Sequence, residues 1–219
     1  MIKIIIHITK FVIATVTALL FASCNFNMNS IEGSGNVTTE KRTVQGDFKN
    51  VSVSNAIDLV IEQSDVTEVT VEADDNLQKE IVTKVENGTL VISCKYSSFR
   101  NITMKKVTVK MPVIDKIEAS SASSVQSKNV IEGENITLES SSAASMQVNI
   151  ESDKISVDSG SGSSVTLEGK ALSLSTSASS GGSIEADKLA ANDVEAQASS
   201  GGTINVNSIV TLKAKASSG

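Results

Sequence analysis

The C-terminal stretch ASSGGSIEADKLAANDVEAQASSGGTINVNSIVTLKAKASSG, residues 178–219, contains the tetrapeptide ASSG three times, starting at Ala178, Ala198 and Ala216. An isoleucine follows soon after each of the first two copies. A catalytic loop is seldom repeated within one chain, whereas a structural unit that stacks on copies of itself is. The stretch therefore predicts a stacked fold and leaves the biochemical activity open.

The repeat extends towards the N-terminus as five units. Each unit has a strand with alternating apolar residues, a corner rich in Ser, Ala and Gly, and a second strand. The units begin at Ile117, Ile136, Ile155, Leu172 and Val194, and their second strands open at Val125, Met146, Val165, Ile184 and Ile204. The steps of 19, 19, 17 and 22 residues are typical of solenoid rungs. A last corner stops at Gly219 before its second strand, which leaves open an unusual cap or a shortened sequence.

The composition of the corners has a physical reason. Equivalent residues of a parallel coil stack about 4.8 Å apart, so a tight corner has room inside only for small side chains. Ser hydroxyls can also bond to the backbone or to the Ser of the next rung. The pairs Gly181-Gly182 and Gly201-Gly202 allow positive φ where the chain turns. A disordered Ser/Gly linker is the alternative, but regularly spaced Ile, Val and Leu argue against it.

Residues 44–115 predict a β-rich region in front of the repeats. Runs such as Val51–Val53 and Val107–Met111 alternate apolar with polar residues, as half-buried strands do. The dipeptide Asn87-Gly88 predicts a hairpin, and only residues 76–81 could form a helical turn. The predicted fold class is all-β, with parallel β-helix or solenoid-like repeats over 116–219 that continue from the N-terminal β-rich part.

The N-terminus is typical of an exported protein. Lys3 and Lys10 flank a short apolar run, and Phe21-Ala22-Ser23-Cys24 resembles a bacterial lipobox. This resemblance implies a signal peptide over 1–23, lipidation of Cys24, and a polar tether over 24–43. We expect a protein anchored by lipid in the outer membrane, on either its periplasmic or its cell-surface side. An ordinary secretory signal with an incidental Cys is the alternative.

The composition excludes several kinds of chemistry. The net charge is −6, and about −8 once Lys3 and Lys10 are removed, which argues against a nucleic-acid partner. The sole histidine, His7, lies in the signal, so the exported chain lacks an imidazole base for a serine or cysteine nucleophile. Without histidine and with one further cysteine, Cys94, we expect no zinc and no other cofactor. Cys94 ends a strand-like run, so we expect a buried, inert thiol.

Two groups of residues are candidates for binding. Glu72, Asp74 and Asp75, with Asn76, could offer oxygen atoms to calcium, although a solvated turn is the favoured interpretation and no calcium-binding pattern is present. Tyr96 and Phe99 could form an exposed aromatic contact, whereas Phe48 is expected in the core.

Four segments precede the Ser/Gly-rich repeats in a characteristic order: Gly46–Val51, Ala56–Leu59, Val69–Leu77 and Asn87–Ile92. With these segments and the repeats, the exported chain as a whole resembles the head GIN autotransporter adhesin family of Bacteroidetes lipoproteins, a DUF2807-like domain. The family's eponymous Gly-Ile-Asn triplet stands here as Ala56-Ile57-Asp58. The resemblance implies a head GIN-type domain over 44–219, an all-β and partly β-helical fold, envelope placement, and an adhesive role.

Together these features predict a non-enzymatic, membrane-anchored envelope lipoprotein that acts as an adhesin or binding module. A glycan, a protein or a second copy of the chain could be its partner. We expect no catalytic residue, no cofactor and no metal ligand. A carbohydrate-active β-helix enzyme that uses acidic residues, and a structural protein that stacks end to end, are the alternatives.

Overall fold

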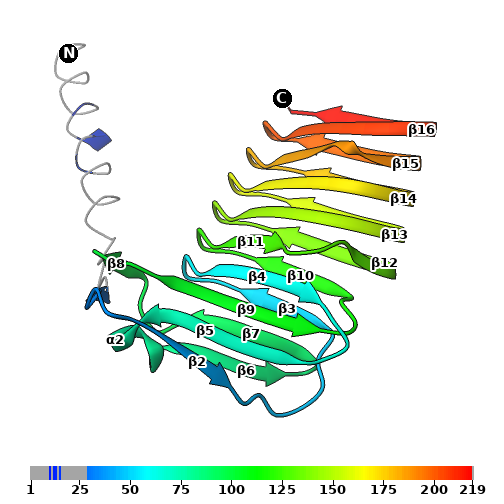
Figure 1. Cartoon of the computed structure of the whole chain (residues 1–219). Helices are drawn as coiled ribbons and strands as arrows, with labels where there is room; N and C mark the ends of the chain where they lie inside the picture. Colours follow the sequence, from blue (N-terminus) through cyan, green and yellow to red (C-terminus); the bar gives the residue numbers. More distant parts are fainter. Residues whose placement is uncertain (1–9, 11, 14, 16–28, 219) are drawn as a thin grey trace, which may run out of the picture.

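The computed structural model describes residues 10, 12, 13, 15 and 29–218. It is built almost entirely from strands, which confirms the all-β fold class. A base formed by the N-terminal part carries an inclined stack of parallel rungs that extends to the C-terminus (Figure 1). Among the described residues, no helix is long and apolar enough to span a membrane. Cys24 lies outside the described residues.

The described elements follow one another in a simple order. The base contains β1 (Ser30–Glu32), β2 (Val37–Arg42), β3 (Asn50–Val53), β4 (Asp58–Gln63), β5 (Glu68–Asp74), the short helix α2 (Asp75–Gln78), β6 (Ile81–Glu86), β7 (Thr89–Cys94), β8 (Ser98–Arg100) and β9 (Lys105–Met111). The stack contains β10 (Lys116–Ala119), β11 (Ser124–Ser127), β12 (Ile131–Ser140), β13 (Ser145–Ser159), β14 (Ser164–Ala178), β15 (Ser183–Ser199) and β16 (Thr203–Ser217).

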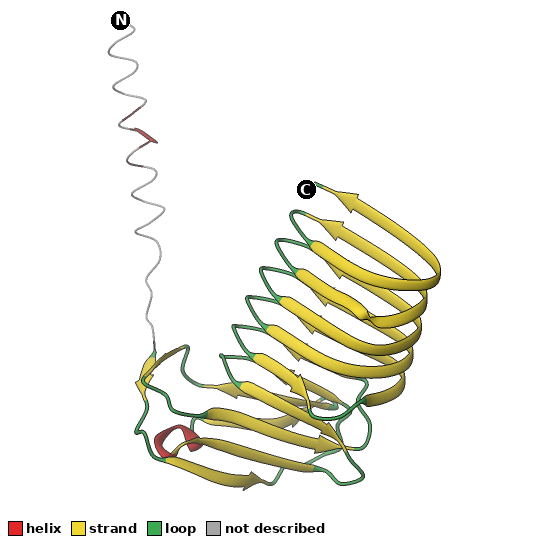
Figure 2. Cartoon of the chain, turned by 45° about the horizontal axis from the view of Figure 1, so that its top comes forward, coloured by secondary structure: helices red, strands yellow, loops and turns green. Residues whose placement is uncertain are grey.

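From β13 onward each strand makes nearly a whole rung. It runs along one layer, around a wide bend, and back along the facing layer to a tight corner (Figure 2). The stack grows on both layers of the base, because β10 pairs in parallel with β3 and β11 pairs in parallel with β4. Apolar side chains from both layers fill the space between them, so each rung covers the interior of the one before it.

The register of the rungs differs in part from the sequence prediction. The column of second strands is confirmed, because Val125, Met146, Val165, Ile184 and Ile204 pair in order. Ile155, however, pairs with Leu174, so Leu172 does not begin a unit. Ile117 likewise pairs with Leu138 and not with Ile136. Leu172 lies on the wide bend with 56% of its surface exposed, and Leu174 is fully buried.

The tight corners are four-residue turns. Their two central residues have positive φ, as at Ser121 (53°) and Ala122 (59°) or Ser142 (53°) and Ala143 (61°). Both central residues of a type I′ turn need this conformation. The N–H of each second central residue donates to the carbonyl of the first central residue one rung above, as from Ala122 to Ser142. This ladder of backbone bonds offsets the strain of the left-handed residues.

The predicted role of the paired glycines is half right. Gly181 occupies a left-handed corner position with φ 75°. Gly182 does not have positive φ, but a Cβ there would lie 2.2 Å from the carbonyl oxygen of Ser159 in the rung below. The second glycine therefore allows close approach of two backbones and not a turn.

The predicted serine contacts inside the corners are present. Ser163 donates to the carbonyl of Ser140 in the rung below at 2.8 Å, and its hydroxyl lies 2.9 Å from that of Ser159. All three serines are buried. Buried hydroxyl groups lose stability when they have no hydrogen-bond partner. This network supplies the partners, so serines can fill the corner interior without a large desolvation penalty.

The base confirms most of the local predictions. β6 and β7 form an antiparallel hairpin whose turn residues Asn87 and Gly88 have φ 49° and 76°. The only helical turn described in this region is α2, where one was expected. The predicted tether over 24–43 is in part wrong, because β1 and β2 lie within it and β2 pairs with β5 along its whole length.

Candidate binding groove

A column of carboxylates crosses the outer surface of one layer. Glu118, Glu139 and Asp158 are direct partners on successive rungs, and Ser177 follows on the next. Their neighbours in sequence are buried, so strand alternation points these side chains outward. In-register parallel pairing spaces them about 4.8 Å apart, which gives a regular line of oxygen atoms along the stack.

A groove of about 480 Å³ runs beside this column, next to the tight corners. It crosses five strands that pair in succession, from Ser52 of β3 through β10, β12 and β13 to Ser177 of β14. Its lining is polar apart from one alanine and one glycine, and consists of carboxylates and of serines from the strands and corners. Such a surface offers many hydrogen-bond donors and acceptors.

The charges along the groove are only partly balanced. Lys116 bridges two rungs, with its Nζ 2.5 Å from Glu118 and 2.8 Å from Glu139. These hydrogen bonds raise the pKa of Lys116. Asp158 forms no ion pair with any other part of the described chain and is exposed. The third carboxylate is therefore available to a ligand.

This geometry suits an extended ligand better than a compact one. A carboxylate recurs on three successive rungs, at Glu118, Glu139 and Asp158, so a polymer lying along the stack can make the same kind of contact several times. Glycosidases place their two carboxyl groups on opposite sides of the scissile bond. Glu118, Glu139 and Asp158 instead lie on one surface in one line.

The acidic residues proposed as calcium ligands do not converge. Glu72 forms an ion pair with Lys106 at 2.6 Å on the outside of the sheet. Asp75 accepts a hydrogen bond from the side-chain amide of Asn36, and hydrogen bonds from Ser34 and Asn36 lower the pKa of Asp75. No group of three or more potential ligands that could hold a metal ion occurs in the described part of the chain.

Asp74 is not part of a solvated turn, because its surface is completely buried. Its Oδ1 accepts hydrogen bonds from the backbone N–H groups of Thr103 and Met104, and its Oδ2 accepts one from Gly35. A buried carboxylate is tolerated when its oxygen atoms are satisfied in this way. Asp74 thus fastens two distant loops to the end of β5.

The triplet Ala56-Ile57-Asp58 lies at the first tight corner of the stack. Asn55 and Ala56 have φ 63° and 53°, and Ala56 N–H donates to Ser121 in the next corner. Gly would adopt this backbone without strain. Asp58 accepts a hydrogen bond from Ser124 one rung above. The triplet therefore forms the first of the stacked tight corners.

The two candidate aromatic residues are half-buried and pack against the core, so they do not form the exposed contact that the sequence left open. The Nζ of Lys105 lies 3.2 Å from the centre of the Phe99 ring and donates to the carbonyl of Asn55. Burial lowers the pKa of Lys105 to about 8, although the nearby Cys94 and Asp58 act in the opposite direction. The thiol of Cys94 is free and buried, as predicted.

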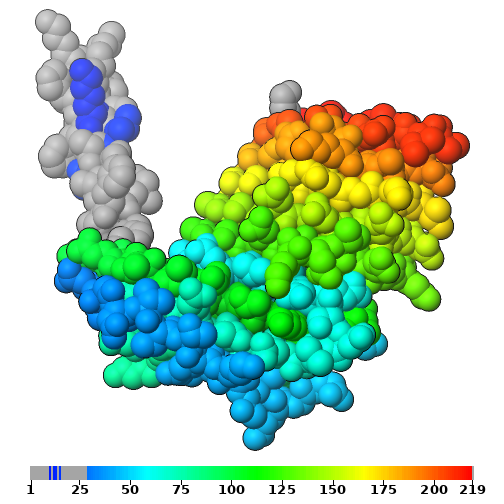
Figure 3. Space-filling model, in the orientation of Figure 1, coloured from blue at the N-terminus to red at the C-terminus, as the bar shows by residue number. Residues whose placement is uncertain are grey.

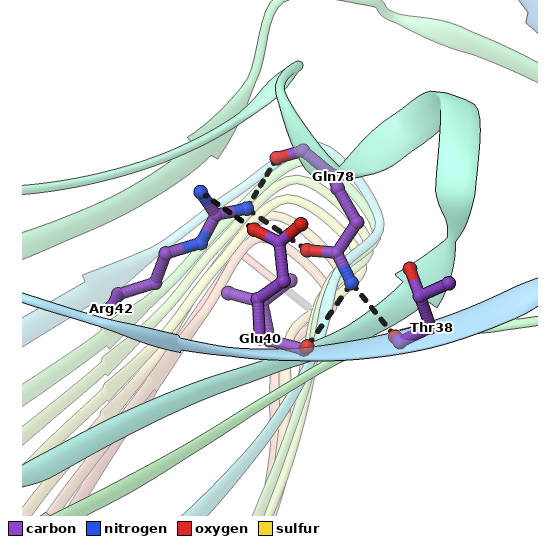
Figure 4. Close-up of polar contacts among 5 residues, drawn as sticks. Thr38, Glu40, Arg42 and Gln78 are labelled. Atoms are coloured by element: carbon purple, nitrogen blue, oxygen red, sulfur yellow. Dashed lines mark hydrogen bonds and ion pairs between the residues drawn. The ribbon is translucent and has the colours of Figure 1, made fainter.

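A polar cluster at the edge of the base was not predicted from the sequence (Figure 4). The guanidinium of Arg42 donates to the backbone and side-chain oxygens of Gln78 and lies 3.3 Å from Glu40. The Gln78 amide donates to the carbonyls of Thr38 and Val71. The cluster holds the edge strand β2 to α2, while the Nε of Arg42 is buried and has no hydrogen-bond partner among the described residues.

Comparison with known proteins agrees with this architecture. A family model described as "putative auto-transporter adhesin, head GIN domain" matches residues 47–219. The chain belongs to the head GIN adhesin family. No protein of curated function matches the chain.

The head GIN chain also resembles solved structures. A putative adhesin of Bacteroides fragilis has a TM-score of 0.79 and 26% identity, covering 85% of this chain and 87% of the other. A putative adhesin of Parabacteroides distasonis has a TM-score of 0.67 and 23% identity, with coverages of 87% and 98%. A putative lipid binding protein of the same species has a TM-score of 0.65 and 18% identity, with coverages of 87% and 97%. The last two similarities concern the fold alone.

Proposed function

We propose that this head GIN protein is a non-enzymatic binding protein of the cell envelope, an adhesin that holds an extended polymer along the stack. The observation that carries the proposal is the groove of about 480 Å³ with its in-register column of Glu118, Glu139 and Asp158. An acidic and hydroxyl-rich surface favours neutral or amino-sugar glycans over acidic ones, since like charges repel.

Two exposed residues of β13 provide a matched test. Asp158 faces the groove, whereas Gln147 faces outward from the opposite layer. Asp158→Arg adds a long cation to the groove and should weaken binding to immobilised amino-sugar polymer at least tenfold. Gln147→Arg adds the same side chain elsewhere and should change binding less than twofold. Equal losses in both variants, or no binding by the exported chain to any neutral or amino-sugar glycan, would contradict the proposal.

The non-enzymatic part of the proposal has its own test. The captured polymer should be recovered without new reducing ends or unsaturated products after prolonged incubation. Turnover that disappears on Glu139→Gln would instead support the carbohydrate-active alternative.

We further propose that Cys24 anchors the protein in the outer membrane. The support is the lipobox-like sequence at Phe21–Cys24 together with membership of an adhesin family. Metabolic labelling with a fatty acid should mark the wild-type protein and leave Cys24→Ala unlabelled. Equal labelling of both would disprove acylation at this position.

A further inference from the structure

A second and larger cavity lies in the base, away from the groove. It measures about 650 Å³, is open to solvent on one side, and is lined by the loop between β2 and β3, the start of β5, and residues 112 and 113 after β9. Figure 3 shows the β2–β3 loop projecting from the bottom of the molecule. β2 and β6 are the two ends of the sheet order, and Gly46 of this loop lies against Val85 of β6. The loop therefore spans the open side between the two layers.

Five of the eleven residues that line the cavity are apolar. Val69 belongs to the buried core, and Val44 and Phe48 are partly buried and packed against it. Pro112 and Val113 complete the wall, and Val113 remains 42% exposed. The hydrophobic interior of the base thus continues to the surface at this point. Apolar area that the chain leaves open in this way favours an apolar ligand.

The rim of the cavity carries two cations, Arg42 and Lys49, beside one acid, Asp47. Arg42 is fixed in place by Gln78 and Glu40. Lys49 is different, because its side chain is 65% exposed and its ion pair with Asp115 is long, at 3.9 Å. An exposed pair of this length contributes little stability, so the ammonium can exchange it for another anion at low cost.

We propose that this cavity binds a single-chain anionic amphiphile, namely a fatty-acid carboxylate. The acyl chain lies against Val44, Phe48 and Val113, and the carboxylate pairs with Lys49 at the rim. The volume falls within the range of about 300–1,000 Å³ that is usual for small-molecule sites. This site is distinct from the glycan groove, so one function can fail without the other.

Calorimetric titration of the exported chain with saturated fatty acids tests the proposal. Octanoate, decanoate and dodecanoate below their micelle concentrations should bind one to one. Their affinity should rise by up to about fourfold for each added methylene. Dodecylammonium, which has the same chain and the opposite charge, should bind at least tenfold more weakly than dodecanoate. Absence of saturable binding, or binding only to vesicles of anionic phospholipid, overturns the proposal.

Variants locate the site. Lys49→Glu should weaken dodecanoate binding about tenfold, and Val113→Asp should abolish it. Lys154→Glu, which changes an exposed cation on the stack, and Asp158→Arg in the groove should leave it unchanged. If Val113→Asp does not fold, Lys49→Glu still decides the matter because that side chain is mostly in solvent. Unaltered affinity in Lys49→Glu would show that the carboxylate does not lie at this rim.

Discussion

Leu174→Asp is expected to unfold the stack at 25 °C. Leu174 is completely buried and lies between Ile155 and Val194 in the column of paired rungs. Removing a buried leucine costs about 2–5 kcal/mol, and placing a carboxylate in the apolar interior adds a further desolvation cost. The sum is comparable to the whole stability of a typical domain, about 5–15 kcal/mol. Circular dichroism during urea denaturation measures the effect.

Leu172→Asp provides the control, because it makes the same change two residues earlier. Leu172 is 56% exposed on the wide bend, so its replacement should alter the free energy of unfolding by less than about 0.5 kcal/mol. The opposite order of effects would mean that the rungs are in the register predicted from the sequence, with Leu172 inside.

Gly169→Ala is expected to destabilise the protein by about 2–4 kcal/mol. Gly169 has φ 131°, and a Cβ there would lie 2.0 Å from the carbonyl oxygen of Ile150 on the neighbouring rung. Backbone strain of about 1–3 kcal/mol adds to the cost of overpacking against a carbonyl group that cannot move away alone. The midpoint of urea denaturation should fall accordingly.

Gly162→Ala is the matched control for this change. Gly162 also has positive φ, 71°, but a Cβ there meets nothing within 4 Å. Ala122 and Ala143 already occupy the same position in the two preceding corners, at φ 59° and 61°. We expect a loss of only about 1 kcal/mol, from the left-handed backbone alone. Similar losses in Gly169→Ala and Gly162→Ala would show that the two rungs do not approach closely at Gly169.

The parts of the fold that were predictable depend on local chemistry. Asn87-Gly88 specifies its own turn, and the small residues of each corner specify theirs. The register of the rungs depends on the bends, which break the alternation of strands. Leu172 and Leu174 should share a face in a straight strand, but the bend intervenes, and Ala171 and Leu174 are the buried residues.

The errors at the candidate sites arise from contacts between distant segments. Asp74 appears solvated in the sequence, but the loops that carry Gly35 and Thr103 close over it. β2 was not predicted because it lacks alternating apolar residues. Thr38, Glu40 and Arg42 occupy the positions opposite apolar residues of β5 such as Val71. Gln78 of α2 forms hydrogen bonds with Arg42 and with the carbonyl of Thr38 on this strand. The sequence near Gln78 contains no pattern that predicts these contacts. The groove likewise exists only when three carboxylates 19 to 21 residues apart are stacked.

A disulfide between successive rungs tests the central claim, the in-register stacking of parallel rungs, most directly. Ser156 and Ser175 are direct partners on the outer surface. Paired Cα atoms at the spacing of neighbouring strands, about 4.8 Å, can form a disulfide, whereas atoms more than about 7 Å apart cannot without backbone movement. In a Cys94→Ser background, Ser156→Cys with Ser175→Cys should cross-link nearly completely under mild oxidation, as shown by mass spectrometry. Ser156→Cys with Ser173→Cys is the control, because Ser173 lies on the same face of β14 but two residues before the partner of Ser156. This second pair should remain mostly reduced. Preferential cross-linking of the second pair would contradict the stack described here.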